Sequence, residues 1–443
     1  MTDQLAIGSK ELKNRPRLLF LAYSFPPATA VACVRAWNIA THLARLGWDV
    51  TVVTLDPSIR RDVGDPEKVV TELDRTGIKQ ILTGHRWRFL WADGLKCWNQ
   101  SLGWLTGGVC RILARYVGID RHIGWIKEAE RACSKLSPSD VDVILVSGSP
   151  FVAFRLAKQL SDRTGRPYVL DYRDPWTGNP HAGRPPRSAT IREEASLLQG
   201  CAAVTVVSPS WGADLDQRYG VGAKLHVVTN GYDPNEMAAV KPHDFGHCAI
   251  VYTGNFYPPR RVISPFLTAL QYLKEYSGKA NAEWYFHYYG GEGNHVREQA
   301  AQLDLNDRIV LHGKVPRHEV LSAVKGASLA VVIVSIEEQA SSDMAGMVPA
   351  KIYEAIGLET PVLLIAPNGS DATKVTASTG LVKSFTANDT HGMISYVKSV
   401  IHGEVPRSEN IDTFSWQTIG RNIDAVLRQA VSRNGHDERA GQE

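Results

Sequence analysis

The stretch "DYRDPW" (residues 171–176) places three charged side chains and a tryptophan directly after an apolar run. Carboxylates accept hydrogen bonds from hydroxyl groups, an arginine fork binds phosphate or carboxylate, and an indole ring covers the apolar face of a sugar. The stretch therefore predicts an acceptor-binding rim made of Asp171, Arg173, Asp174 and Trp176. Asp171 should orient the loop, by capping backbone N–H groups or pairing with Arg173, whereas Asp174 should contact an acceptor hydroxyl. The alternative, charges that only fix the loop under a packed tryptophan, fits the sequence equally well.

A second chemical pattern lies in "VPAKIYEAIGLETPVLL" (residues 348–364), where a proline opens a short helix. Lys351 and Glu354 are three residues apart, so they share one face of that helix. Either they form an ion pair within the helix, or the ammonium group neutralises phosphates while the carboxylate binds a ribose diol. The second interpretation makes this segment part of a nucleotide-sugar site.

The segment "YTGNFYPPRR" (residues 252–261) leaves another apolar run. Gly254 lets a ligand approach the backbone closely, because glycine has no Cβ. Arg260 and Arg261 stand near the next helix start, where a diphosphate would contact them. The alternative is that both arginines are simply solvated.

Two loops in the first half precede helix starts, whose free N–H groups can bind an anion. They contain Pro27, Ala28 and Thr29 in "AYSFPPATA" and Ser149 in "SGSPFVAF". The first loop does not match GxGxxG, so a dinucleotide fingerprint is absent there. The competing interpretation is a proline-stiffened turn in one case and an ordinary helix cap in the other.

These segments are predicted to follow strands of two parallel sheets. Short apolar runs such as "RLLFLAY", "VDVILVS" and "PYVLDY" alternate with helical stretches, the pattern of a doubly wound sheet covered on both faces. After a polar segment the pattern restarts with "CAIVYTG" and continues through "TPVLLIA". The expected fold class is α/β, with two doubly wound Rossmann-like domains whose strand ends face a central cleft.

The expected domain limits follow from the same pattern. We expect an N-terminal acceptor-binding domain, a linker, a C-terminal nucleotide-sugar domain, a C-terminal helix that packs back on the first domain, and a disordered tail. Their respective ranges are residues 1–235, 236–247, 248–415, 416–432 and 433–443.

Bulk composition limits the function classes. The chain has 443 residues, 44% of them hydrophobic, and a formal charge of only +3, so no nucleic-acid partner is expected. Six cysteines without CxxC or Cys/His spacing argue against a zinc site or disulfides and for a reducing compartment. The N-terminus lacks the apolar core of a secretory signal, and no apolar run reaches about 18 residues, so a cytoplasmic protein is expected.

Residues 85–126 combine basic side chains with Trp87, Trp91, Trp98, Trp104 and Trp125. The favoured interpretation is a helical insert of the first domain that packs on its core. The alternative is a peripheral surface that meets lipid-linked acceptors at the inner face of a membrane, because tryptophan and basic residues suit that boundary.

The order and spacing of these motifs resemble the glycosyltransferases of family 4, which have the two-domain GT-B architecture. The resemblance extends over about residues 15–432. It is carried by "LLFLAYSFPPATAVACVRAWNIATHLARLGWDVTVVT", "VSGSPFVAFRLAKQL", "YVLDYRDPW", "VTNGYD", "YTGNFY", "YYGGEGN", "LHGKVPRHEVL" and "PAKIYEAIGLETPVL".

The resemblance implies a retaining transfer of a sugar from a UDP- or GDP-sugar, without a metal ion or cofactor. The acceptor would be a glycan, a glycolipid or a small molecule, in polysaccharide, glycoconjugate or natural-product biosynthesis. The donor would bind mainly to the C-terminal half and the acceptor to the N-terminal half.

The resemblance also assigns roles to residues. Glu354 matches the second Glu of the family's E-x7-E motif and would hold the ribose. Arg260 or Arg261, with Lys351, would neutralise the diphosphate as it leaves. The expected catalytic set is Asp174, Arg260 and Lys351. The expected donor-binding set is Gly254, Asn255, Arg261, Gly290, Met347, Val348 and Glu354.

The sequence departs from the family pattern in several places. The first Glu of the E-x7-E motif is replaced by Gly346, and Asn255 stands where the family usually has an arginine. The first loop is not glycine-rich, and "SGSPF" lacks the histidine that the family often has. Two other functions therefore stay open: a sugar-nucleotide epimerase or hydrolase, and a catalytically silent partner on the same scaffold.

Overall fold

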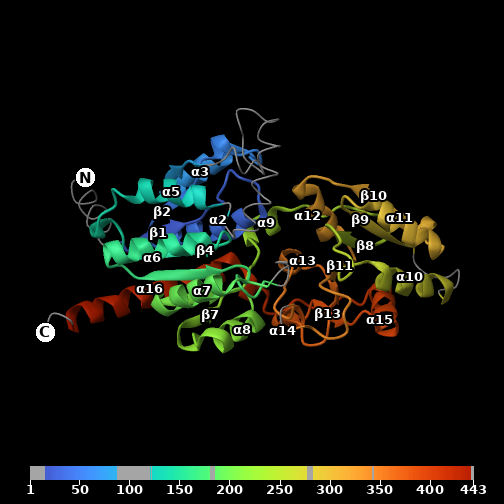
Figure 1. The fold of residues 1–443 in the computed structure, drawn as a ribbon. Helices are drawn as coiled ribbons and strands as arrows, with labels where there is room; N and C mark the ends of the chain where they lie inside the picture. The colour runs from blue at the N-terminus through green and yellow to red at the C-terminus, as the bar shows by residue number, and fades with distance from the viewer. Residues whose placement is uncertain are drawn as a thin grey trace, which may run out of the picture. The chain divides into compact units, whose positions relative to one another are not determined.

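The chain folds into two α/β units, which Figure 1 shows with the element labels used below. The computed structural model describes residues 15–86, 120, 122–179, 185–276, 283–341 and 344–440. Unit 1 comprises Met1–Val207, Gly212–Val228 and Gly420–Glu443, and unit 2 comprises Ser208–Trp211 and Thr229–Ile419. The border therefore falls a few residues before the position 235 that the sequence suggests.

Unit 1 contains a seven-stranded parallel sheet in the order β3-β2-β1-β4-β5-β6-β7. Its central strands are buried on both faces, which explains why they are continuous apolar runs in the sequence. The strands are β1 (Arg17–Leu21), β2 (Asp49–Leu55), β3 (Lys79–Thr83), β4 (Val143–Gly148), β5 (Tyr168–Tyr172), β6 (Ala203–Val206) and β7 (Leu225–Val227).

Helices cover this sheet. Four helices share one hydrophobic core cluster with β1, β4 and β5. They are α5 (Ile123–Cys133), α6 (Val152–Thr164), α7 (Ser188–Gly200) and α8 (Pro209–Tyr219). The others are α2 (Val31–Arg45), α3 (Pro66–Thr76) and α16 (Trp416–Ala440). In α16, Asp424 Oδ1 accepts a 2.6 Å hydrogen bond from Trp48 Nε1, which fixes the helix to unit 1. The helix also continues to Ala440, beyond the end at residue 432 that the sequence predicts.

Most of the tryptophan-rich region 85–126 lies outside the described residues, including Trp87, Trp91, Trp98 and Trp104. Trp125 is described and is fully buried in the unit 1 core, where its Nε1 donates to Thr83 Oγ1 at 2.8 Å. For Trp125 the packing interpretation is therefore correct and the membrane-facing one is wrong. In the described ranges, no helix has both the length and the apolar character that a membrane span requires.

Unit 2 contains a six-stranded parallel sheet in the order β10-β9-β8-β11-β12-β13. Alternate residues of β8 face opposite core clusters: Ile250 and Tyr252 lie in one, Ala249 and Val251 in the other. The strands are β8 (Cys248–Thr253), β9 (Trp284–Tyr289), β10 (Ile309–Gly313), β11 (Leu329–Ile333), β12 (Val362–Ile365) and β13 (Val382–Phe385).

Two sets of helices pack against these two clusters. On the first face lie α10 (Ser264–Tyr276), α11 (Gly293–Gln302) and α15 (Thr390–Ile401). On the second lie α9 (Pro234–Ala239), α12 (Arg317–Gly326), α13 (Ala350–Gly357) and α14 (Asp371–Thr376).

The segment expected to be a linker, residues 236–247, is part of unit 2 and begins inside α9. Asp233 caps this helix by accepting from the backbone N–H groups of Asn235 and Glu236, and Pro234 occupies the first helical position. Six residues are too few to show a helical period, so the sequence pattern missed the helix.

Three histidines form a row across the first strands of this sheet. His287 of β9 has one ring nitrogen 2.9 Å from His247 Nε2 and the other 2.9 Å from His312 Nε2. Burial, together with repulsion from His312 and His247, lowers the pKa of His287 to about 4. With all three rings neutral, each of the two contacts can pair one N–H with one acceptor nitrogen, so the row joins neighbouring strands as a chain of hydrogen bonds.

Candidate active site

Each sheet has one topological switch point, where successive strands begin to be added on the opposite side of the first strand. It lies between β1 and β4 in unit 1 and between β8 and β11 in unit 2. Ligands of doubly wound sheets bind beyond the carboxyl ends of the strands at such points. The sequence-predicted residues follow β1, β4 and β5 in unit 1 and β8 and β9 in unit 2, with Lys351 and Glu354 on α13.

In unit 2, two glycines follow the ends of β8 and β9, where neighbouring groups lie close to the backbone. Gly254 has a φ of +99°, and a Cβ there would lie 3.3 Å from Lys351 Nζ. A Cβ at Gly290, after β9, would lie only 2.5 Å from the carbonyl oxygen of Gly254. The absence of side chains at both positions therefore lets the end of β8 approach the neighbouring backbone and Lys351 closely.

Lys351, in the first turn of α13, extends to the end of β8. Its Nζ donates to the carbonyl oxygen of Thr253 at 2.6 Å and lies 4.4 Å from the centre of the Tyr252 ring. Burial lowers the pKa of Lys351 to about 7, the positive charge of Arg261 adds to this effect, and Glu354 partly opposes it. The ion pair with Glu354 that the sequence allowed is not formed.

Arg261 lies close enough to Lys351 for the two charges to repel each other. Its guanidinium donates to the carbonyl oxygen of Val334 at 3.4 Å and to Met347 Sδ at 3.3 Å, and it lies 5.1 Å from the Tyr257 ring. Among the described residues, no carboxylate forms an ion pair with either cation. Two neighbouring basic side chains without an ion-paired carboxylate, at the switch point of a parallel sheet, are a candidate binding place for an anion.

Arg260 differs from Arg261, because its Nε forms a 3.2 Å ion pair with Glu337 Oε1. Arg260 thus has a carboxylate partner in a partly exposed ion pair, whereas Arg261 forms no ion pair among the described residues. Of the other expected donor contacts, Asn255 is exposed at the end of β8, and Met347 and Val348 are half-buried before α13.

Glu354 forms an ion pair that the sequence did not indicate. Arg317, the first residue of α12, donates from Nη1 to Glu354 Oε1, and also contacts Glu236 of α9. The Glu354 side chain is 27% exposed, so its carboxylate can still be reached by a ligand. No sequence signal identifies Arg317, because its partners are 37 and 81 residues away.

The structure explains the glycine at position 346. A Cβ on Gly346 would lie 2.4 Å from Trp211 Cδ1 and 2.6 Å from Ser208 Oγ, both in the segment Ser208–Trp211 that groups with unit 2. A glutamate therefore cannot occupy this position without moving the tryptophan. The indole of Trp211 fills the space that the first Glu of the motif would need.

In unit 1, the role expected for Asp171 is wrong. Its carboxylate is fully buried and binds Arg35 of α2, with distances of 2.7 Å to Nη2 and 3.0 Å to Nε. Ser147 and Thr205, on the strands that flank β5, donate to it at 2.9 and 2.7 Å. Burial alone would raise the pKa of Asp171, but Arg35 and the two hydroxyls outweigh it and lower the pKa. Asp171 therefore holds three strand ends and α2 together and cannot contact an acceptor.

Tyr172 is the buried last residue of β5, and residues 173–176 form a half-buried loop after it. Arg173 does not pair with Asp171; its Nε lies 3.5 Å from Asp174 Oδ2, and the Asp174 side chain is 49% exposed. Trp176 stacks on Phe151, with ring centres 5.4 Å apart and planes 7° from parallel, and packs against the unit 1 core. The structure thus supports a packing role for Trp176 and leaves Asp174 as the accessible carboxylate.

The two loops that precede helix starts differ in exposure. Ala28 is buried and pairs with Val63 in a β-bridge, and the N–H of Thr29 donates to the carbonyl oxygen of Asp62 at 3.0 Å. Pro27 is half-buried beside them. Ser149, after β4, is exposed. The first loop is therefore held by its neighbours but still exposes Thr29, and Ser149 is exposed in the second loop.

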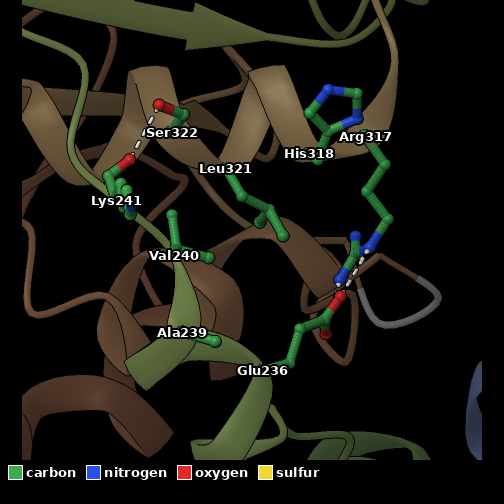
Figure 2. Close-up of a pocket in the computed structure, with 8 residues that line it drawn as sticks. All are labelled: Glu236, Ala239, Val240, Lys241, Arg317, His318, Leu321 and Ser322. Atoms are coloured by element: carbon green, nitrogen blue, oxygen red, sulfur yellow. Dashed lines mark hydrogen bonds and ion pairs between the residues drawn. The ribbon is translucent and has the colours of Figure 1, made fainter.

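Figure 2 shows a pocket of about 530 Å³ in unit 2, where Arg317 points towards Glu236. It is lined by Glu236, Ala239, Val240, Lys241, Arg317, His318, Leu321 and Ser322. The pocket adjoins the Glu354 ion pair through Arg317 but does not include Glu354. None of its lining residues was singled out by the sequence.

Two family models match the chain. The model described as Glycosyltransferase Family 4 matches residues 33–236, and the one described as Glycosyl transferases group 1 matches residues 247–401. Together they cover the greater part of both units. No curated protein matches the sequence.

Solved structures with the same fold cover nearly the whole chain. A glycosyltransferase from Rickettsia africae ESF-5 is 14% identical, with a TM-score of 0.56 and coverage of 96% of this chain and 97% of that one. A sucrose-phosphate synthase from Thermosynechococcus elongatus is 15% identical, with a TM-score of 0.55 and coverage of 96% and 99%. Anabaena HepE, solved with UDP-glucose, is 15% identical, with a TM-score of 0.52 and coverage of 95% and 99%. The expected fold class and family are thus confirmed: the chain belongs to the family 4-like glycosyltransferases and has their GT-B fold of two Rossmann-like α/β domains.

Proposed function

We propose that this glycosyltransferase moves a sugar from a UDP- or GDP-sugar to an acceptor hydroxyl, with retention of configuration and without a metal ion. The observation that carries the proposal is the pair of basic side chains Lys351 and Arg261, neither of which forms an ion pair with a carboxylate among the described residues. The pair lies where β8 ends at a glycine, so a diphosphate can approach the backbone.

In this proposal the cations act on the leaving group. Negative charge develops on the diphosphate as the sugar–phosphate bond breaks, and fixed positive charges stabilise it without reorganisation. Glu354 binds the ribose hydroxyls through its carboxylate. The similar Anabaena structure, which contains UDP-glucose, supports a nucleotide diphosphate-sugar as the donor.

The acceptor is proposed to bind unit 1. Asp174 is the carboxylate of the "DYRDPW" loop that remains half-exposed, and Ser149 is exposed after the neighbouring strand. A carboxylate in this position accepts the hydrogen bond of a sugar hydroxyl and orients its oxygen for transfer.

A ligand screen tests the donor part of the proposal. The full chain is heated with UDP, GDP, their monophosphates and their glucose, galactose, mannose and N-acetylglucosamine conjugates. A diphosphate present at 100 times its dissociation constant should add about 2.7 kcal/mol of stability. If no nucleoside diphosphate raises the melting temperature, the proposal is wrong. Binding without transfer to any acceptor would instead support a catalytically silent protein.

Asp174→Asn should reduce transfer by about tenfold or more and leave donor affinity unchanged, because a hydrogen bond to a charged group contributes roughly 1.5–3 kcal/mol. Initial rates at saturating donor and calorimetric titration of the nucleotide measure the two effects. The control is Asp162→Asn, an exposed carboxylate on α6 that pairs only with Lys158. Full activity of the Asp174 variant, or an equal loss in the control, would remove Asp174 from the acceptor site.

A further inference from the structure

Arg317 is the first residue of α12, a position that its own helix does not favour. The N-terminus of a helix carries partial positive charge, so a cation there is repelled. The place of Arg317 is therefore explained by its contacts with other elements and not by the stability of α12.

Those contacts join three helices. Arg317 Nε and Nη2 donate to the two carboxylate oxygens of Glu236 on α9, at 3.3 and 3.2 Å, a bidentate fork that Figure 2 shows. Its remaining terminal nitrogen, Nη1, donates to Glu354 Oε1 on α13. Burial would lower the pKa of Arg317, but Glu354 and Glu236 outweigh it and raise the pKa, so the guanidinium stays charged.

The fork has a direct consequence for Glu354. In the described part of the chain, Arg317 is the only hydrogen-bond donor to the Glu354 carboxylate, and it uses Oε1 alone. Lys351, one turn earlier on the same helix, donates instead to the carbonyl oxygen of Thr253. One oxygen of Glu354 is thus held and the other, Oε2, is available.

We propose that Arg317 is a positioning residue that fixes the Glu354 carboxylate so that Oε2 accepts a hydrogen bond from the donor ribose. The inference rests on the proposed function and adds a specific element to it. Glu236 supports the arrangement by orienting the guanidinium through the Nε and Nη2 edge. A lysine could not replace Arg317, because a single ammonium group cannot hold two carboxylates in a fixed planar geometry.

The test compares nucleotides with and without ribose hydroxyls. Calorimetry with UDP, 2′-deoxy-UDP and 3′-deoxy-UDP, and with the corresponding guanosine series, gives the preference of the full chain for ribose. The parent protein should prefer the complete ribose by about tenfold or more, since its hydroxyl donates to a charged group. Glu354→Gln should lose most of this preference, and Arg317→Ala should lose it to a similar degree while Glu354 is still present.

Arg317→Lys keeps the charge and nearly the same size, so it tests the proposal even where the alanine variant does not fold. It should also lose most of the ribose preference. Arg297→Ala is the control, because Arg297 is exposed on α11 and, within the described ranges, its side chain hydrogen-bonds to Asn294 of the same helix. The control should keep the parental preference.

The outcomes separate the two proposals. A ribose preference that disappears in Glu354→Gln but persists in both Arg317 variants would overturn the positioning role and leave the proposed function intact. Equal weakening of the complete and deoxy nucleotides in the Arg317 variants would show that Arg317 is only structural. If the parent binds no diphosphate, the proposed function fails and this inference fails with it.

Discussion

Arg35→Ala should lower the free energy of unfolding of unit 1 by about 3–5 kcal/mol, because it leaves a buried carboxylate without its counter-charge. Asp171 and Arg35 have side-chain exposures of 0% and 2%, and their closest approach is 2.7 Å. The Arg35 guanidinium also donates to the carbonyl oxygen of Val228 at 3.1 Å, and that bond is lost as well. Urea denaturation of the full chain, followed by circular dichroism, measures the loss.

The matched control is Arg17→Ala, which removes another Arg–Asp pair of the same unit. The side chains of Arg17 and Asp142 are 37% and 23% exposed, so water can solvate the remaining charge. The control should cost about 1 kcal/mol or less. Equal losses in the two variants would show that the burial of Asp171 does not set the energetics of its pair.

The effect of Arg35→Ala should also depend on pH. In the parent, the pKa of Asp171 is below its ordinary value, so its stabilising contribution is lost only as the pH falls through that lowered pKa. In the variant, the lone buried carboxyl has a raised pKa and becomes neutral in mild acid. The difference in stability between the two proteins should therefore narrow as the pH falls below about 5.

Lys351→Met should reduce transfer by roughly 10²–10³-fold, the usual cost of removing one group that stabilises charge in the transition state. Methionine is an unbranched side chain of similar size, but it removes the ammonium group and with it the cation–π contact with Tyr252. Initial rates at saturating donor measure the effect. Lys383→Met, on an exposed position of β13, is the control and should keep the parental rate.

The same variant should remove a pH dependence of diphosphate binding. The pKa of Lys351 is about 7 without ligand, so the group is increasingly neutral above that pH. An anionic diphosphate favours the charged form, so binding takes up a proton and affinity should fall by up to about tenfold per pH unit between pH 7 and 9. The Lys351→Met variant should show a flat profile in this range. A parent whose affinity does not change with pH would contradict the role of Lys351.

The two-sheet architecture can be predicted from sequence patterns alone, because strands buried on both faces must be continuous apolar runs. The sequence also located several strand ends correctly, such as Gly254 after β8 and the charged loop after β5. It missed β3 and β13, which lie at the edges of their sheets and are only partly buried. Edge strands need no continuous apolar run, so their pattern resembles that of a loop.

The ionic partners of the charged site residues depend on how the chain folds. Asp171 is buried and is neutralised by Arg35, which lies 136 residues earlier. Glu354 pairs with Arg317, which lies 37 residues earlier, through Oε1 alone and stays partly exposed. Neighbouring Arg260 and Arg261 look equivalent in the sequence, yet only Arg260 has a glutamate partner among the described residues. The strength of an ion pair depends on distance in space and on exposure to water, and neither is encoded in local spacing. The sequence therefore identifies candidate charged residues of the site, and the structure shows which residues they pair with.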